Sequence, residues 1–159
     1  MDLIKPLILI VCANAMPVVL HTLFGDRMRI PLDGGKLFFD GRPVFGNSKT
    51  LRGLLGSLLV TTAIALLLDL PPAIGLLIAT GAMAGDLFSS FVKRRLGMRP
   101  SSQAIGLDQI PEALFPLLLV MQEFQLSITA VLSATLIFVL LEMTLSPLLH
   151  KLHLRDTPY

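Results

Sequence analysis

The hydrophobic and polar positions of the chain fall into long blocks. Five apolar segments stand between polar stretches, over residues 3–24, 53–70, 72–92, 110–126 and 127–149. Four of them match the roughly 20 residues that a helix needs to cross a bilayer. The segment 110–126 is short and holds two prolines, but apolar sequence restarts at once at Ser127, which favours a full crossing and a tight turn. We therefore predict an all-α integral membrane protein, a single domain with five transmembrane helices.

The composition agrees with a membrane protein. Of the 159 residues, 53% are hydrophobic and 15% are charged, whereas a soluble domain carries about a quarter charged residues. The mean hydropathy is +0.76. Cys12 is the only cysteine, which excludes an internal disulfide and a zinc site built from cysteines.

The basic residues lie almost entirely on one side of the predicted helices. Residues 25–52 hold six of the 13, residues 93–109 hold four, and the tail after Leu149 holds two. Lys5 alone lies on the other side. The positive-inside rule therefore predicts that the N-terminus is outside and that both long loops and the C-terminus are cytoplasmic.

An alternative for the first apolar segment is a cleaved signal peptide, because Ala13-Asn14-Ala15 has the A-x-A form of a cleavage site. The apolar stretch continues to Phe24, however, and Lys5 makes a weak basic start. These features favour a retained helix.

An acidic residue inside the third apolar segment marks the predicted site. On a helix, Asp86, Ser90, Lys93 and Gly97 fall within a sector of about 60°. An acid about 10 Å below a basic cluster, on the same face, suits an anion and its metal ion. The simpler interpretation is a buried Asp paired with a lysine beneath a solvated loop. We favour function, because an ionisable group in a membrane helix costs about 2.5–3.5 kcal/mol on insertion scales.

A second candidate lies where the first loop enters the second helix. The stretch Gly46-Asn47-Ser48-Lys49-Thr50 leads through Arg52 into apolar sequence. Free backbone N–H groups and the positive end of the helix dipole favour phosphate there, and the two cations add charge. The stretch is not a P-loop, because the first glycine of that motif and its preceding strand are missing.

Glycines predict how the loop and helices fold. Asp33-Gly34 and Asp40-Gly41 are turn dipeptides, so we expect the first loop to be folded over the membrane surface. Gly81-x-x-x-Gly85 precedes Asp86 in the third helix, and small residues at this spacing let helix backbones approach closely.

Four further polar residues are candidates for the site, and three of them keep two interpretations. Asp108 and Glu112 share a face at the mouth of the fourth helix; Asp108 is either its N-cap, a metal ligand, or both. Asn14, three residues before Pro17, makes either a helix-to-helix hydrogen bond or a substrate contact. Glu142 lies at a depth similar to that of Asp86, and its alternative role is to be the buried partner of a loop cation.

The sequence gives little support for a protein nucleophile. It contains no pair of histidines, no Ser-His-Asp set and no Cys-His pattern. His21, His150 and His153 fall at helix ends, as is typical of residues at the membrane interface.

Four ordered motifs, LDGGKLFFDGRP, FGNSKTLRG, GDLFSSFVKRRLG and LDQIPE, resemble the CDP-archaeol synthase family. That resemblance implies transfer of CMP from CTP, with Mg²⁺, to the phosphate of a membrane lipid, with release of pyrophosphate. In archaeal members the lipid is a digeranylgeranylglycerol phosphate. The chain departs from the family pattern at Leu51, where a Trp is common, and in residues 99–105, which leaves the lipid open.

The motifs and the residue chemistry together define an expected site. A lipid phosphate is already an anion, so it needs no general base; carboxylate-held Mg²⁺ and a ring of cations suffice. We expect the catalytic residues to be Asp86, Lys93 and Asp108, and the metal ligands to be Asp86, Asp108 and Glu112. The expected substrate-binding residues are Asn14, Lys36, Gly46, Asn47, Lys49, Thr50, Ser90, Arg52 and Arg94. Asp33, Lys36 and Asp40 are second-tier candidates for loop closure or for the cytidine.

The expected partners are CTP, a lipid phosphate and the bilayer of the cell membrane, with the site facing the cytoplasm and with no nucleic acid; a homodimer stays open. A membrane glycerol-phosphate acyltransferase is the main alternative, although it would need a central His or Ser. A small transporter or scaffold would explain the helices but not the convergent acids and cations. CDP-alcohol phosphotransferases are excluded, because their paired-Asp motif is absent.

Overall fold

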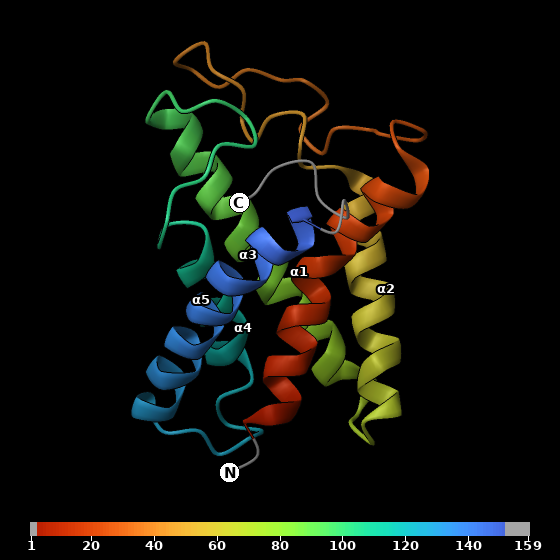
Figure 1. Cartoon of the computed structure of the whole chain (residues 1–159), viewed down its shortest axis with the longest axis vertical. Coiled ribbons are helices and arrows are strands. Elements are labelled where there is room, and N and C mark those ends of the chain that lie inside the picture. The colour runs from red at the N-terminus through yellow and green to blue at the C-terminus, as the bar shows by residue number, and fades with distance from the viewer. Residues whose placement is uncertain (1–2, 152–159) are drawn as a thin grey trace.

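The computed structural model describes residues 3–151, with side chains described as far as Thr144. It contains five helices in these residues: α1 (Ile4–Phe24), α2 (Leu51–Leu67), α3 (Pro72–Arg95), α4 (Gln109–Leu119) and α5 (Ile128–Lys151). Figure 1 shows them as a bundle, with the two long loops gathered at one end and residue 3 near the other. The all-α prediction and the number of helices are confirmed. The basic tail at Lys151 and Arg155, and also His150 and His153, lie outside the described side chains.

The fourth helix is shorter than predicted. We expected a helix over 110–126, but α4 has 11 residues and ends at Leu119. A helix of that length reaches about 16 Å, well below the roughly 30 Å of a bilayer core. The chain then turns, with Leu126 N–H donating to the Met121 carbonyl at 2.8 Å and Gln125 at a positive φ of 49°. The two prolines weaken the helical run, and apolar composition did not show where it stops.

Two helices, α1 and α3, are long and apolar enough to cross a membrane by length and composition, and the described parts of the other three are shorter apolar helices. The third helix is longer than predicted, because it continues through Lys93 and Arg94 to Arg95. The basic run therefore lies on the last turn of a helix, where cations also interact favourably with the helix dipole.

Glycines bring α3 close to α4, as the small-residue spacing predicts. A Cβ atom on Gly85 would lie 2.2 Å from the carbonyl oxygen of Pro111, and one on Gly81 would lie 2.6 Å from Cα of Pro116. Both contacts are with backbone, which cannot move aside easily. This close approach holds the part of α3 around Asp86 against the start of α4.

The first loop, residues 25–50, is folded as a two-stage hairpin. Its base is a bridge between Pro31 and Thr50, and its tip is a bridge between Leu37 and Pro43. Gly34 and Gly41 have φ of 58° and 73°, so both predicted turns are present. The loop covers the end of the bundle at which the second loop also lies (Figure 1).

The carboxylate of Asp33 joins the two stages of the hairpin. One oxygen accepts from the Gly35 N–H at 3.0 Å, and the other accepts from the N–H groups of Phe45 and Gly46 at 2.9 Å each. Burial opposes ionisation of Asp33, but these backbone hydrogen bonds outweigh it and hold its pKa below the ordinary value. Asp33 therefore orders the loop in this structure, and its expected role in loop closure or at the cytidine stays a prediction.

Candidate active site

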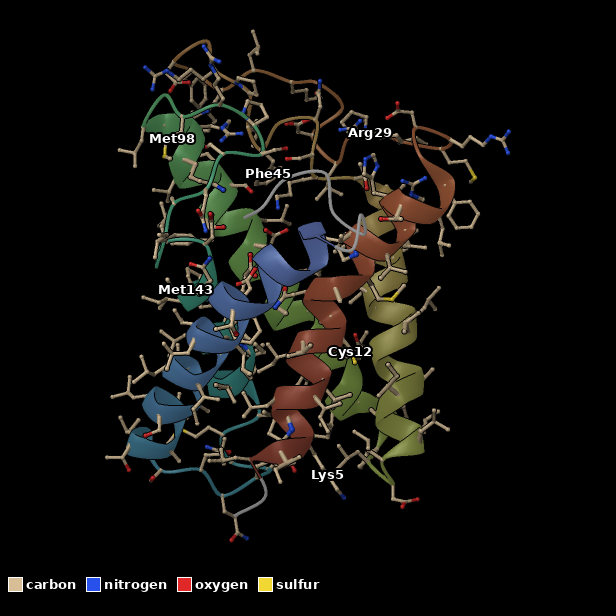
Figure 2. The ribbon with its side chains drawn as sticks, in the orientation of Figure 1. Lys5, Cys12, Arg29, Phe45, Met98 and Met143 are labelled. Atoms are coloured by element: carbon tan, nitrogen blue, oxygen red, sulfur yellow. The ribbon has the colours of Figure 1, made fainter. Side chains whose placement is uncertain are left out.

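A cavity of about 390 Å³ lies at the loop end of the bundle. All five helices contribute to its lining, as do both loops. Its volume is within the range of small-molecule sites. Figure 2 shows polar side chains gathered at this end, around the level of Arg29 and Phe45, whereas the middle of the bundle around Cys12 is mainly apolar.

The acidic face of α3 points into this cavity. Asp86, Ser90 and Lys93 all line it, so the predicted sharing of one helix face is confirmed as far as Lys93. Gly97 lies beyond the end of the helix and outside the lining. Ser89 instead donates to the Asp86 carbonyl at 2.9 Å and packs within the bundle.

Two ion pairs cross the cavity. Lys49 Nζ lies 2.5 Å from Asp86 Oδ1, and Lys93 Nζ lies 2.6 Å from Asp108 Oδ1. Lys93 also donates to the Ser102 carbonyl at 2.8 Å. Each lysine thus pairs with an acid from a different segment, and the pairs fasten both loops to the helices. An Asp paired with a lysine was the simpler interpretation of Asp86, and the pairing is present, but within a cavity rich in other charges.

Two more acids complete the acidic side of the cavity. Glu112 is 8% exposed and interacts electrostatically with Asp86, Glu142 and Lys49. Glu142 also lines the cavity. Like charges at this depth raise one another's free energy, so they need cations between them. Lys49 is one such cation.

Three arginines line the cavity, namely Arg29, Arg52 and Arg94, and the last two also bind loop backbone. Arg94 is 3% exposed and donates to the Arg99 carbonyl at 2.7 Å. Arg52 donates to the carbonyls of Arg27 and Gly25. Each of these two guanidinium groups therefore holds the backbone of one loop while it contributes positive charge to the cavity.

The start of α4 does not have the cap that one interpretation of Asp108 predicted. Asp108 occupies the N-cap position, but its side chain makes no capping hydrogen bond there. Its Oδ2 instead accepts from the Ala104 N–H at 2.8 Å, and Oδ1 faces Lys93. The capping interpretation is therefore wrong. At α2 the cap is Thr50, whose hydroxyl accepts from the Gly53 N–H at 3.2 Å.

Four of the expected substrate-binding residues lie outside the cavity lining. Lys36 and Asn47 are exposed in the loop, and Gly46 is buried against Arg94 and Pro100. Asn14 lies in α1 with its amide nitrogen buried and without a hydrogen-bond partner among the described residues. The structure brings together the other expected residues: Lys49, Thr50, Arg52, Asp86, Ser90, Lys93, Arg94, Asp108 and Glu112.

The helix α1 contributes to the cavity through residues other than Asn14, the one residue expected from it. Pro17, Val18, His21 and Thr22 line it, so His21 faces the site rather than only the membrane interface. Their spacing follows one helical face, a signal that was available but was not joined to the motifs. Arg29, Gln103 and Gln109 were also missed; their positions depend on loop folding, for which the sequence gives no periodic signal.

Apolar helices around a charged cavity define the class of this protein, a multi-pass helical membrane protein with its polar chemistry inside the bundle. A solved structure described as an intramembrane enzyme for archaeal membrane lipid biosynthesis is similar, with a TM-score of 0.76 and 33% identity over 89% of this chain and 90% of the other. The family model for CDP-archaeol synthase, of the CarS-like type, matches residues 71–159. The chain belongs to the CDP-archaeol synthase family.

Curated relatives carry the same family name. The CDP-archaeol synthase of Pyrococcus furiosus is 44% identical over 107 residues, and that of Thermococcus onnurineus is 41% identical over 109 residues. These alignments cover 61% and 62% of this chain. The chain spans 60% and 61% of the length of these two relatives.

Proposed function

We propose that this protein transfers CMP from CTP to the phosphate of an archaeal ether lipid, forming a CDP-activated lipid and releasing pyrophosphate. The observation that carries the proposal is the cavity in which Lys49 and Lys93 meet Asp86 and Asp108. Family membership supports the nucleotide and the lipid class, since the relatives are named CDP-archaeol synthase.

The lining suits a reaction between two anions. The lipid phosphate attacks the α-phosphorus of CTP, and the bond from that phosphorus to the β-phosphate oxygen breaks as pyrophosphate leaves. The attacking oxygen is already ionised, so no protein nucleophile or general base is required. Lys49, Lys93, Arg52 and Arg94 would bind the phosphates and stabilise charge on the leaving group.

The acids fit a magnesium ion shared with the nucleotide. Asp86 and Glu112 face each other in one cavity and supply the oxygen ligands that Mg²⁺ prefers, with Asp108 at the same mouth. Among the described residues no group of three His, Cys, Asp or Glu side chains forms a complete metal cluster. The expected set of Asp86, Asp108 and Glu112 is therefore not gathered into one group, and we propose instead that a Mg²⁺ takes one or two of these carboxylates and the substrate phosphates as ligands. When bound, the ion would neutralise charge on the triphosphate.

We further propose that the cavity faces the cytoplasm and that the N-terminus is outside. Lys5 lies at one end of the bundle, and Arg29, which belongs to the first basic loop, lies at the other (Figure 2). The positive-inside rule then puts the loop end in the cytoplasm, where CTP is found. Gathering of the cations at one end, rather than their number, supports this orientation.

A substrate panel tests the proposed function. The purified protein in detergent is incubated with Mg²⁺, each of the four ribonucleoside triphosphates and a set of lipid phosphates with ether or ester chains. We expect a nucleotide-linked lipid with CTP, and the fastest formation with an ether-lipid phosphate. A parallel incubation contains glycerol phosphate and an activated acyl donor, and acyl transfer there with CTP untouched would overturn the proposal in favour of the acyltransferase.

A further inference from the structure

Arg95 is the third residue of the basic run and lies outside the cavity lining, although the two residues before it, Lys93 and Arg94, lie within it. Arg95 Nη1 lies 2.9 Å from Asp40 Oδ1. Its Nη2 donates to the carbonyls of Arg42 at 3.3 Å and Pro43 at 2.5 Å. All three partners belong to the tip of the first loop, so Arg95 connects the end of α3 to the hairpin.

The Arg95 guanidinium lies against two aromatic rings that are in contact with each other. Its central carbon lies 4.7 Å from the ring centre of Phe38 and 4.9 Å from that of Phe91. The two rings meet edge to face, with centres 5.2 Å apart. Phe38 comes from the hairpin and Phe91 from α3. A planar guanidinium can stack on a ring face, a contact that the ammonium of lysine does not reproduce although it keeps part of the cation–π attraction.

A second arginine, Arg42 of the hairpin, also connects the hairpin to the end of α3. Arg42 Nη1 donates to the carbonyls of Arg94, at 3.3 Å, and of Arg95, which belong to the last turn of α3 and lack the N–H partner of a helix interior. The Arg94 carbonyl also accepts from the Gly97 N–H at 3.1 Å. A cation there is also favoured by the helix dipole. We call the set Phe38, Asp40, Arg42, Phe91 and Arg95 the clasp.

Hydrogen bonds connect the clasp to Lys49. At the tip, Phe38 N–H donates to the Arg42 carbonyl at 2.8 Å. In the middle, Asp33 accepts from the N–H groups of Phe45 and Gly46. At the base, Leu32 N–H donates to the Lys49 carbonyl at 2.8 Å. A continuous series of hydrogen bonds therefore links the docked tip of the hairpin to Lys49, which lies opposite Asp86.

We propose that Arg95 is a positioning residue: it docks the first loop onto α3 and so holds Lys49 in place for the nucleotide. The inference rests on the proposed function, in which Lys49 binds the triphosphate. The loop needs such a device because much of it is exposed, with Phe39 at 99% and Met28 at 79%. Without the clasp, only a fraction of molecules would hold the closed loop, and apparent affinity for CTP would fall by that fraction.

This role separates the two kinetic constants. Bound nucleotide would close a loosened loop, so saturating CTP would restore the wild-type rate. Arg95→Ala should therefore raise KM for CTP by about tenfold and leave kcat within about twofold. Arg95→Lys keeps the charge and can keep the Asp40 pair, but it loses the stacking, so its KM should be intermediate. Arg99→Ala, which removes a charge from an exposed residue of the same loop end, is the matched control and should leave KM within about twofold.

Hydrogen exchange of the loop amides in the nucleotide-free protein supplies a readout that needs no turnover. Arg95→Ala should speed the exchange of residues 36–46 by tenfold or more, and Arg99→Ala should not. Phe38→Leu, which removes one ring but keeps apolar volume, gives a milder second variant if Arg95→Ala does not fold. Unchanged exchange in the folded variants, or a fall in kcat with KM unchanged, would overturn the proposal. A wild-type protein that consumes no CTP would defeat the proposed function, while exchange would still decide on the clasp.

Discussion

Replacing Asp86 by Asn tests the acidic side of the cavity with the smallest change of shape. The substitution keeps a hydrogen-bond acceptor for Lys49 but removes one negative charge from a site lined by four acids. Because Asn is a weak ligand for a hard cation, we expect kcat to fall by at least about 100-fold, a barrier change of about 2.7 kcal/mol.

The cost in stability should be much smaller. Removing one partner of a fully buried ion pair costs about 3–5 kcal/mol, but Lys49 and Asp86 are 23% and 17% exposed, and Lys49 keeps an electrostatic interaction with Glu112. We expect a loss of about 1–2 kcal/mol once solvent screening is included. The protein should therefore stay folded and extractable while it loses activity.

The assay compares initial rates of CDP-lipid formation with thermal unfolding in the same detergent. Asp69→Asn is the matched control, because Asp69 is exposed in the turn between α2 and α3 and has a positive φ of 57°, which Asn tolerates well. It should keep wild-type activity. If Asp86→Asn kept more than about a tenth of the wild-type kcat, a barrier change below about 1.4 kcal/mol, the assignment of Asp86 to the metal would be refuted.

Three further predictions concern orientation, packing and the loop. In a protein whose Cys12 has been replaced, Phe39→Cys should react with an impermeant thiol reagent only after the membrane is opened, and Gln122→Cys should react from outside; the reverse pattern would contradict the proposed orientation. Gly85→Ala should lower the unfolding free energy by about 2 kcal/mol or more, because its Cβ would meet the Pro111 carbonyl, whereas Ala84→Ser at the exposed neighbour should not change the melting temperature. Asp33→Asn should speed amide exchange at Phe45 and Gly46. Because the folded-state pKa of Asp33 is lowered, the stabilisation by its carboxylate is present above the ordinary Asp pKa of about 3.9 and is lost as pH falls below it. Loss of wild-type protection already near pH 6 would contradict this role.

The features that the sequence predicted are those with a local physical signal. Apolar run length predicted five helices, and helical periodicity placed Asp86, Ser90 and Lys93 on one face. The turn dipeptides predicted two turns in the first loop, because glycine is the residue that adopts positive φ angles readily. The small-residue spacing of Gly81 and Gly85 predicted a close approach to another helix, which the structure identifies as α4.

The features that it did not predict depend on contacts between distant segments. Nothing local shows that the Asp108 carboxylate turns back to Ala104 instead of capping α4, or that Arg95 faces the hairpin while Arg94 faces the cavity. The end of α4 at Leu119 lies within apolar sequence, so composition gives no signal for where the helix ends. Gly46 and Asn47 were expected at the site because they precede a helix, but the hairpin holds them outside the cavity lining.

The central claim is that the α-phosphate of CTP moves to a membrane lipid, and the fate of each phosphate of CTP tests it most directly. The wild-type protein, Mg²⁺ and an ether-lipid phosphate are incubated in parallel with CTP labelled at the α- or the γ-phosphate. We predict that the α-label enters the lipid and the γ-label enters pyrophosphate, in equal molar amounts. Label from the γ-phosphate in the lipid, or no consumption of CTP at all, would contradict the account.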